Sequence, residues 1–427
     1  MASAARSGQA RSGQAGGQAT ALRRQSGPGN LGPVRLQQLV LLEVAAALVL
    51  VGYVVDPLLA APAGGVALVL AVLALARRRQ RPVPEWIGAV LALRRRARRT
   101  AVAVPADTAP SLAPVVECDP ALRTGSFTDR EGRSVGVVGD GTFVTAVLQV
   151  EAVDAPLRPR RTDKALPLGL LRDAMDVADV RLESVQVVQS ALPSPAPHLP
   201  AQALAARNYA PLQALTGSPA VRMTWIALKL DPELCPEAVA ARGGGVEGAR
   251  RCVLRAAGQL ASRLQGAGFR ATLLSEDGLT TALSTAASVN PAATAQAGRN
   301  GAGARRTAET SRTWRCDDRW HTTYWVSRWP QLGQGAASLP QLAALLTSLP
   351  ALSTTMSLTL GRGRARGGTQ APTVTGHVRV CGRSADELGE VRRELERAAR
   401  GVKVGLVRLD HEQIPGVLAT LPLGGTR

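Results

Sequence analysis

The protein has 427 residues, of which 45% are hydrophobic and 19% charged, and its formal net charge is +19. That length leaves room for a membrane-inserted segment and one or two folded domains. The five cysteines are scattered, odd in number and include no C-x-x-C pair. This pattern argues against a disulfide framework or a zinc site and favours free thiols in a reducing compartment.

Two long apolar runs follow an N-terminal tail. Residues 1–33 are rich in Ala, Gly, Ser, Gln and Arg and predict a disordered cytoplasmic tail. Residues 34–80 predict a transmembrane hairpin with helices over about 36–55 and 58–76, because a helix needs ~20 apolar residues to cross a bilayer. Asp56-Pro57 forms the tight turn between them. A buried hairpin of a soluble protein is the alternative, and a cleaved signal peptide fits poorly because a second run follows at once.

Arginines flank the two runs, and the first 100 residues hold 14 arginines against three acidic residues. Because Arg-rich flanks stay in the cytoplasm, both termini are predicted to be cytoplasmic. Residues 81–114 predict a basic juxtamembrane helix and a linker. The side chains expected at the surface of an anionic membrane are Arg77, Arg78, Arg79, Arg81, Trp86, Arg94, Arg95, Arg96, Arg98 and Arg99. A lipid- or nucleic-acid-binding regulator that uses these Arg blocks is an alternative, although the blocks lack the interleaved aromatics of a nucleic-acid surface.

Glu43 lies inside the first apolar run. A carboxylate within a membrane is costly and is therefore a functional candidate by default. Its place near the start of the helix favours a simpler interpretation, in which it reaches the membrane interface together with Gln37 and Gln38. Contact with a partner helix is the second interpretation.

Residues 115–289 predict a first α+β module. Its strands over 134–138 and 142–151 flank Gly139-Asp140-Gly141, which is a strong hairpin signal and only loosely resembles a phosphate loop. The rest of the module alternates between helix and strand, with helices predicted over 166–177, 201–215, 246–266 and 277–287 and strands over 180–190, 220–230 and 269–274.

Residues 290–306 predict a flexible linker, and residues 307–427 a second α+β module. The second module begins with a hairpin around Asp317-Asp318. Its predicted strands are 310–316, 319–328, 352–361, 373–382 and 404–409, and its predicted helices are 339–349, 384–400 and 411–421. Apart from one extra helix in the first, both halves read β-β-α-β-β-α-β-α, which predicts related modules that share or pair their sheets. Chance similarity between Ala/Leu-rich helices is the alternative.

Motifs for catalysis and cofactor binding are missing from the sequence. There is no phosphate-binding G-x-x-x-x-G-K-[ST], no dinucleotide-binding G-x-G-x-x-G after a strand, no G-x-S-x-G and no H-E-x-x-H. We therefore predict no catalytic, cofactor-binding or metal-ligating residues. The alternative is a membrane-tethered enzyme with a site near Asp317, Asp318 and His321.

Residues 313–330 hold four of the six tryptophans. These aromatics either pack a hairpin on its own sheet or form a partner surface, because Trp, Tyr and Arg are enriched at binding hot spots. Period-two alternation places large aromatics on both strand faces, so we expect one face to contact the domain and the other to contact a second protein. The predicted interface residues are Trp314, Arg315, Trp320, Tyr324, Trp325 and Trp329.

Several long strings resemble the EccE family of actinobacterial type VII (ESX-type) secretion components, particularly its streptomycete branch. They include Val34-Arg-Leu-Gln-Gln-Leu39, Arg81-Pro-Val-Pro-Glu-Trp86, Val135-Gly-Val-Val-Gly-Asp-Gly141, Arg207-Asn-Tyr-Ala-Pro-Leu212 and Ser311-Arg-Thr-Trp-Arg-Cys-Asp-Asp-Arg-Trp-His-Thr-Thr-Tyr-Trp325. The resemblance implies a non-catalytic, multi-pass subunit of an export complex in the bacterial inner membrane. It also implies EccB-, EccC- and EccD-like partners, the EccC component being the ATPase. We expect no cofactor, no nucleic acid and no small-molecule substrate.

Overall fold

A computed structural model describes most of the chain from residue 34 onward. The described residues are 23–24, 30–31, 34–55, 57–75, 77–78, 81–99, 104–105, 107–128, 132–152, 165–192, 200, 202–216, 219–300, 305–330, 338–363 and 372–425. Within 23–41, 57–60 and 72–85, the description is limited to the backbone. Most of the predicted tail 1–33 therefore lies outside the described residues.

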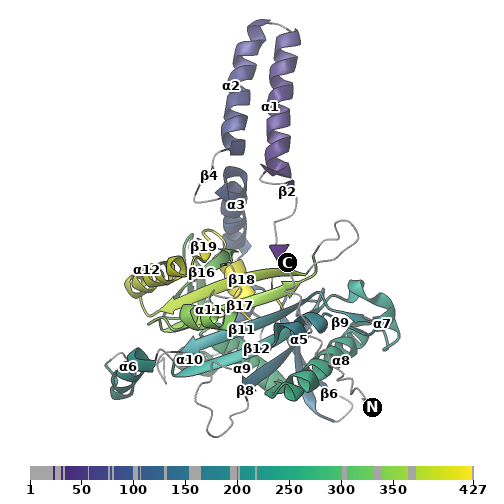
Figure 1. The fold of residues 1–427 in the computed structure, drawn as a ribbon, viewed down its shortest axis with the longest axis vertical. Helices are drawn as coiled ribbons and strands as arrows, with labels where there is room; N and C mark the ends of the chain where they lie inside the picture. The colour runs from purple at the N-terminus through teal and green to yellow at the C-terminus, as the bar shows by residue number, and fades with distance from the viewer. Residues whose placement is uncertain are drawn as a thin grey trace, which may run out of the picture.

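One large, mainly antiparallel sheet organises the body of the molecule (Figure 1). The strand order is β14-β15-β16-β18-β17-β11-β12-β8-β7-β6, with β13 beside β8, β19 beside β16 and β1 beside β18. The strands are β1 Arg23–Arg24, β6 Arg123–Thr128, β7 Ser134–Gly139, β8 Val144–Ala152, β11 Ser184–Leu192, β12 Val221–Leu230, β13 Phe269–Leu273, β14 Thr307–Glu309, β15 Trp314–Cys316, β16 Arg319–Arg328, β17 Ser353–Gly361, β18 Thr373–Gly382 and β19 Gly405–Arg408.

The centre of the sheet is the antiparallel pair β11–β17, in register from Ser184 opposite Gly361 to Ala191 opposite Thr354. The strands on one side of this pair come from the first half of the chain, and those on the other come mainly from the second half. The two predicted α+β regions thus pair edge to edge in one sheet. That they are related modules stays a prediction.

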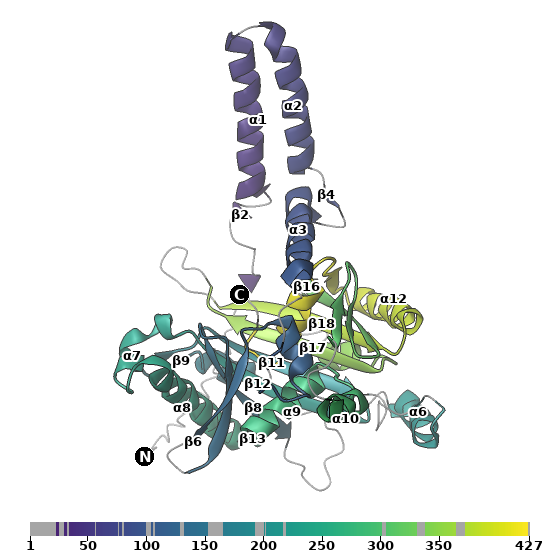
Figure 2. The ribbon, with the colours of Figure 1, turned by 180° about the vertical axis from the view of Figure 1, so that it is seen from behind.

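Helices cover both faces of the sheet (Figures 1 and 2). Buried side chains of α8 on one half and of α11 and α12 on the other pack against one face, while α4, α9 and α13 pack against the opposite face. The helices of the body are α4 Ala113–Cys118, α5 Leu168–Asp173, α6 Leu204–Thr216, α7 Pro236–Ala240, α8 Gly245–Gly266, α9 Glu276–Ala286, α10 Pro291–Asn300, α11 Leu339–Thr347, α12 Ala385–Gly401 and α13 Gln413–Thr420, with a 3₁₀ turn, η2, over Pro232–Leu234.

Strand β8 shows how alternation produces these layers. Its residues Ala146 and Leu148 are fully buried in the core beneath α8, whereas Val147 between them is buried in the core beneath α9 and α13. Successive side chains of a strand point to opposite faces, so a strand that is apolar on both faces must be covered on both. The helices on the two faces are therefore a consequence of the sequence of the central strands.

A helical hairpin and a third helix precede this body. The helices are α1 Leu36–Val55, α2 Pro57–Leu75 and α3 Val83–Arg99, and the short strand pairs β2–β3 (Asn30–Leu31 and Val34–Arg35) and β4–β5 (Arg77–Arg78 and Arg81–Pro82) lie at the base of the hairpin. Helices α1 and α2 project away from the sheet, and α3 lies between the hairpin and the sheet (Figures 1 and 2). Ala45 and Ala67 are buried, but many large apolar side chains of the hairpin are exposed, Leu50, Tyr53 and Leu68 among them. Among the described residues, no helix combines the length and apolarity required to cross a bilayer.

Most predicted elements are confirmed to within a few residues, including α1, α2, α8, α12 and the β15–β16 hairpin. One prediction is wrong: Pro291–Asn300 forms helix α10 where the sequence predicted a linker. This segment is Ala-rich and starts with a proline, both of which favour a helix. The pattern also missed β6 and α4, and it merged β10 (Val180–Arg181), which pairs with β9 (Asp176–Val177), into the following strand.

Candidate functional site

The Trp-rich hairpin β15–β16 is largely part of the protein's own core. Trp314 is completely buried, with its ring centroid 4.8 Å from that of His321. Tyr324 is 2% exposed, and its hydroxyl donates to Glu396 Oε1 at 2.7 Å. Burial and this carboxylate raise the pKa of Tyr324 above its usual range. Two of the six predicted interface residues therefore contact the chain itself rather than a free surface.

The other four residues of that set remain accessible. Arg315 is exposed, and its guanidinium lies 5.9 Å from the ring of Trp320, which is half-buried. Trp325 is also half-buried, as is Trp329, which packs so closely over Gly376 that a Cβ there would lie 2.5 Å from the ring. A partner surface on this hairpin is thus limited to these four side chains.

The alternative acid–base set around Asp317, Asp318 and His321 does not come together in the fold. Asp317 sits in the β15–β16 turn with φ +55° and accepts a bidentate pair of bonds from Arg306 at 2.8 and 2.9 Å. Asp318 is exposed and accepts from Asn290 Nδ2. His321 is buried on β16, where Nε2 lies 3.7 Å from the Cys381 thiol. The two aspartates bind Arg306 and Asn290, and among the described residues no hydrogen bond or ion pair joins either of them to His321.

A buried basic cluster lies on the same side of the sheet as α9, and sequence reasoning missed it. Arg379 of β18 donates to the carbonyl oxygen of Ala286, and Arg319 of β16 donates to that of Ser288 at 2.8 Å. Both arginines therefore face the C-terminal end of α9, where the helix dipole is negative. Burial lowers the pKa of Arg379 to about 10, and burial together with these two charges lowers the pKa of His321 well below its usual value. Alternation placed both arginines on a strand face, but only the fold shows which helix end they meet.

Helix α3 is joined to the sheet by Arg96. Its guanidinium donates to Glu309 Oε2 at 2.9 Å and Oε1 at 3.0 Å, and also to the carbonyl oxygen of His411 at 2.6 Å. Glu309, whose side chain is 6% exposed, also accepts the backbone N–H of Ile414 at the start of α13. The ring of Trp86 meets that of His411 edge-on, with the centroids 6.0 Å apart. We call these contacts the α3 joint.

The joint bears on the residues predicted at the membrane surface. Arg96 and Trp86 contact the protein itself, whereas the role of the whole set at a lipid surface stays a prediction. Arg94, Arg95 and Arg98 are exposed. The side chains of Arg77, Arg78, Arg79, Arg81 and Arg99 lie outside the described residues. Glu43 is exposed on α1.

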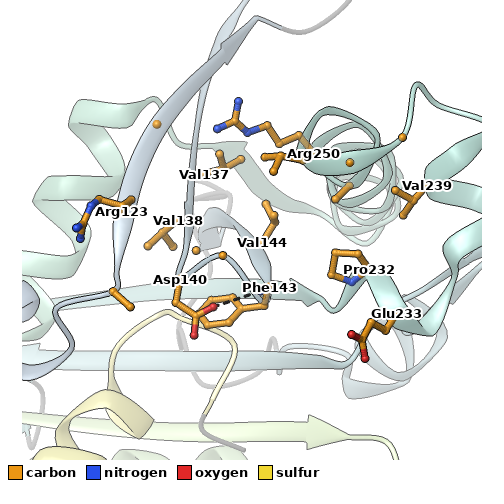
Figure 3. Close-up of a pocket in the computed structure, with 18 of the residues that line it drawn as sticks. Arg123, Val137, Val138, Asp140, Phe143, Val144, Pro232, Glu233, Val239 and Arg250 are labelled. Carbon is orange, nitrogen blue, oxygen red and sulfur yellow. Dashed lines mark hydrogen bonds between the residues drawn. The ribbon is translucent and has the colours of Figure 1, made fainter.

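An open cleft of about 900 Å³ lies at the opposite end of the sheet, on the side of α8 (Figure 3). One wall is the β6–β7 hairpin and the start of β8. The other wall is η2, α7 and the first turns of α8. Most of the lining is apolar, and its side chains include Val137, Val144, Pro232, Val239, Val246 and Ala249.

The charged side chains of the cleft differ in whether they have hydrogen-bond partners within the protein. Arg250 lies at one end, and Asp140 and Glu233 lie at the other (Figure 3). Asp140 Oδ1 accepts bonds from the Thr142 backbone and hydroxyl at 2.8 and 2.7 Å. Burial opposes the charged form of Asp140, but these bonds outweigh it and lower its pKa. Arg250 Nε is buried and makes no hydrogen bond within the described part of the chain, and no described ion pair includes this residue.

Glycines shape this cleft. Gly139-Asp140-Gly141 forms the predicted turn between β7 and β8, and Gly141 has φ +93°. Gly243, Gly244 and Gly245 all have positive φ, a conformation that other residues rarely adopt, and lead directly into α8. The triple glycine was the available sequence signal for a special backbone at this point, but nothing in its spacing indicates that it faces the β6–β7 hairpin. Among the described residues, no group of three His, Cys, Asp or Glu side chains could hold a metal ion.

Comparison with known proteins finds similarity to one family over part of the chain. A family model described as a type VII ESX secretion system translocon, EccE, matches residues 218–326. The ESX-1 secretion system protein EccE1 of Mycobacterium tuberculosis, in strains CDC 1551 / Oshkosh and ATCC 25618 / H37Rv, is 29% identical over 204 residues, which is 45% of this chain. These matches confirm the resemblance to EccE-family type VII secretion components.

The segment matched by the EccE model runs from β12 to β16. It therefore includes α8 with its glycines and Arg250, Glu309 of the α3 joint, and the Trp-rich hairpin. It does not include α1, α2 or α3. The alignment with the mycobacterial EccE1 covers 38% of that protein, so the chain spans well under half of the relative's length.

Proposed function

We propose that this EccE-family protein is a non-catalytic structural and assembly subunit of a type VII secretion complex in the bacterial inner membrane. The observation that carries the proposal is the α3 joint. A bidentate Arg96–Glu309 pair is more strongly oriented than a single hydrogen bond, and Glu309 also holds the start of α13. A hairpin with exposed apolar side chains is in this way tied through α3 to the sheet, as expected of an anchored scaffold.

The membrane anchor is the hairpin α1–α2 in this proposal. Its exposed apolar side chains, such as Leu50, Val54 and Leu68, are unfavourable in water and favourable in lipid. The arginines that flank the two helices in the sequence favour a topology with both termini in the cytoplasm. Exposed Glu43 then lies close enough to the cytoplasmic side to reach the membrane interface.

Other membrane components of the secretion complex, of the EccB, EccC and EccD types, are the proposed partners. Exposed Arg94, Arg95 and Arg98 provide basic groups for anionic lipid head groups near the anchor, where each such charge contributes ~1 kcal/mol. Arg315 and the accessible Trp320, Trp325 and Trp329 provide a second, aromatic surface for protein contact.

The proposal is tested by sizing the protein from native membranes. Membranes are solubilised in a mild detergent, the protein is captured by a C-terminal tag, and the eluate is sized and its components identified. We expect a large assembly that contains a partner with several ATPase domains. Elution alone or as a small oligomer in several mild detergents would overturn the assembly role.

The anchor is tested separately by labelling. The native cysteines are first replaced. In protoplasts with an intact inner membrane, Asp56→Cys should then react with a membrane-impermeant maleimide. Thr108→Cys, placed after α3, should react only after the cells are opened. Equal labelling of both positions in intact cells would contradict the proposed topology.

A further inference from the structure

We infer that the cleft between the β6–β7 hairpin and α8 is a docking site for an apolar peptide segment of another protein that carries an Asp or Glu side chain. The inference rests on the proposed function only in taking the occupant to be a protein. The cleft lies at the end of the sheet farthest along the strand order from the α3 joint. A segment bound there leaves the hairpin and α3 free for their own contacts.

The lining of the cleft is that of a protein interface rather than of a small-molecule site. Small-molecule sites place several polar groups so that they converge on the ligand. Here Asp140 is occupied by its own turn, and Arg123 donates to the carbonyl oxygens of Pro120 and Leu122 at 2.7 and 2.8 Å. What remains is a broad apolar surface with the Glu233 carboxylate at one end and, at the other, Arg250, which has no ion pair among the described residues. Apolar area around an arginine anchor is typical of the centre of a protein–protein interface.

The rim of the cleft also exposes apolar side chains to solvent. Val246, in the first turn of α8, is 60% exposed, and Leu234, in η2 beside the lining residues Pro232 and Glu233, is 37% exposed. Burial of such side chains by a partner contributes about 25 cal/mol per Å² of apolar surface removed from water. The cleft is therefore favourable for an apolar segment independently of any charge.

The charge of the occupant follows from Arg250. Nε of this residue already lies out of solvent without a hydrogen-bond partner, and its Nη2 lies 3.4 Å from the place where a Cβ on Gly125 would be. A neutral apolar segment laid over the cleft would bury the guanidinium further and leave its charge unpaired, which is strongly unfavourable. A carboxylate on the segment removes this penalty through a charge-assisted hydrogen bond. A basic segment would be repelled at the same point.

Peptide selection on the full-length protein in detergent tests the inference. A phage-displayed library of random 12-residue peptides is panned on the wild type, and the selected peptides are then measured by fluorescence anisotropy on wild type and variants. We expect a group of apolar peptides with at least one Asp or Glu whose affinity falls at least tenfold in Val246→Glu. Leu204→Glu, at an exposed position on α6 away from the cleft, is the matched control and should leave the affinity unchanged.

Charge reversal provides the second measurement. The Arg250→Glu variant should bind the same peptides at least tenfold more weakly than the wild type. It should bind more tightly the versions in which the acidic residue is replaced by Lys. If the selected peptides bind Val246→Glu and wild type equally, the cleft is not their site and the inference is wrong. If cleft-dependent peptides contain no acidic residue, the role of Arg250 is wrong. Neither result depends on whether the protein purifies within a secretion complex, so failure here and failure of the assembly role are distinguishable.

Discussion

The two ends of the sheet share the same arrangement of strands but differ in how far the chain covers the side chains there. Three strands lead outward from β12 at one end, in the order β8-β7-β6, and three lead outward from β18 at the other, in the order β16-β15-β14. At the second end the chain covers its own side chains: Trp314 is buried, Arg306 pairs with Asp317, and Arg96 pairs with Glu309. At the first end an apolar cleft stays open and Arg250 has no described partner.

This difference teaches that composition alone does not locate a binding surface. The residue types that mark interfaces are concentrated in the β15–β16 hairpin, yet Trp314 and Tyr324 are used for the core. The β6–β7 end carries valines, glycines and Arg250, which has no ion pair among the described residues, and none of these residue types marks an interface in the sequence. What distinguishes a surface available to a partner is the set of groups that the chain itself leaves uncovered.

Among the substitutions that test this comparison, removal of the Trp314 side chain should have the largest effect on the free energy of unfolding. Trp314→Ala empties a fully buried site beneath α9 and α13 and should lower the free energy of unfolding by about 3–5 kcal/mol. Trp329→Ala, at a half-buried position on the same hairpin, should cost less than half as much. Urea unfolding followed by tryptophan fluorescence measures both. Equal losses would show that the hairpin is not packed as a core element.

Acidification should lower the free energy of unfolding through His377 of β18. Burial lowers the pKa of His377 on β18 to about 4, against ~6.5 in an unfolded chain. As the pH falls, the unfolded state therefore binds the proton first. Between pH 6.5 and pH 4 this histidine lowers the free energy of unfolding by at most ~1.4 kcal/mol per pH unit. His377→Gln should show a shallower fall in unfolding free energy over that interval and little change at pH 8. An unchanged slope would contradict the buried neutral state.

Disruption of the α3 joint should have a smaller and more local effect. Arg96→Ala leaves the Glu309 carboxylate with the Ile414 N–H as its one remaining partner among the described residues. The change should cost about 1–2 kcal/mol, because the pair is partly exposed. Hydrogen exchange across Val83–Arg99 should become faster. Arg95→Ala, at an exposed position on the same helix, is the control and should leave the exchange unchanged. Slow exchange in both variants would show that α3 is held by other contacts.

The smallest effect is expected at the open end. Val246→Glu changes an exposed side chain on the rim of the cleft and should alter the unfolding free energy by no more than ~0.5 kcal/mol. Thermal unfolding of wild type and variant provides the comparison. A loss as large as that of Trp314→Ala would mean that Val246 is needed by the fold, and the contrast between the two ends would fail.

Periodicity and turn chemistry determined most of the secondary structure in advance. The spacing of Val253, Ala257, Leu260 and Leu264 predicts the buried face of α8, and Ser384 with Glu387 predicts the start of α12, where the Ser384 side chain does accept from the Glu387 N–H. Gly139-Asp140-Gly141 was correctly interpreted as a hairpin turn. These features depend on neighbours within a few residues, so they can be seen in one dimension.

Periodicity and turn chemistry did not predict the hydrogen bonds of the buried polar side chains. Gln186 of β11 and Ser357 of β17 both donate to the carbonyl oxygen of Ala419, near the C-terminal end of α13, at 2.8 and 2.7 Å. Ser184 likewise donates to that of Gly424 at 2.5 Å. In the sequence these are ordinary polar residues of a strand. Their role is visible only when segments more than 60 residues apart are brought together.

The sequence by itself determined most helices and strands, the apolar N-terminal hairpin and the family resemblance, because each rests on local pattern or on long strings of matching residues. Tertiary structure alone decided that the two α+β regions pair through β11 and β17, that Arg96 binds Glu309, and that one end of the sheet is covered while the other is open. The physical reason is that burial and charge pairing depend on distances in space between residues far apart in the chain. A side chain's type limits what it can bind, and the fold decides whether that capacity is already used.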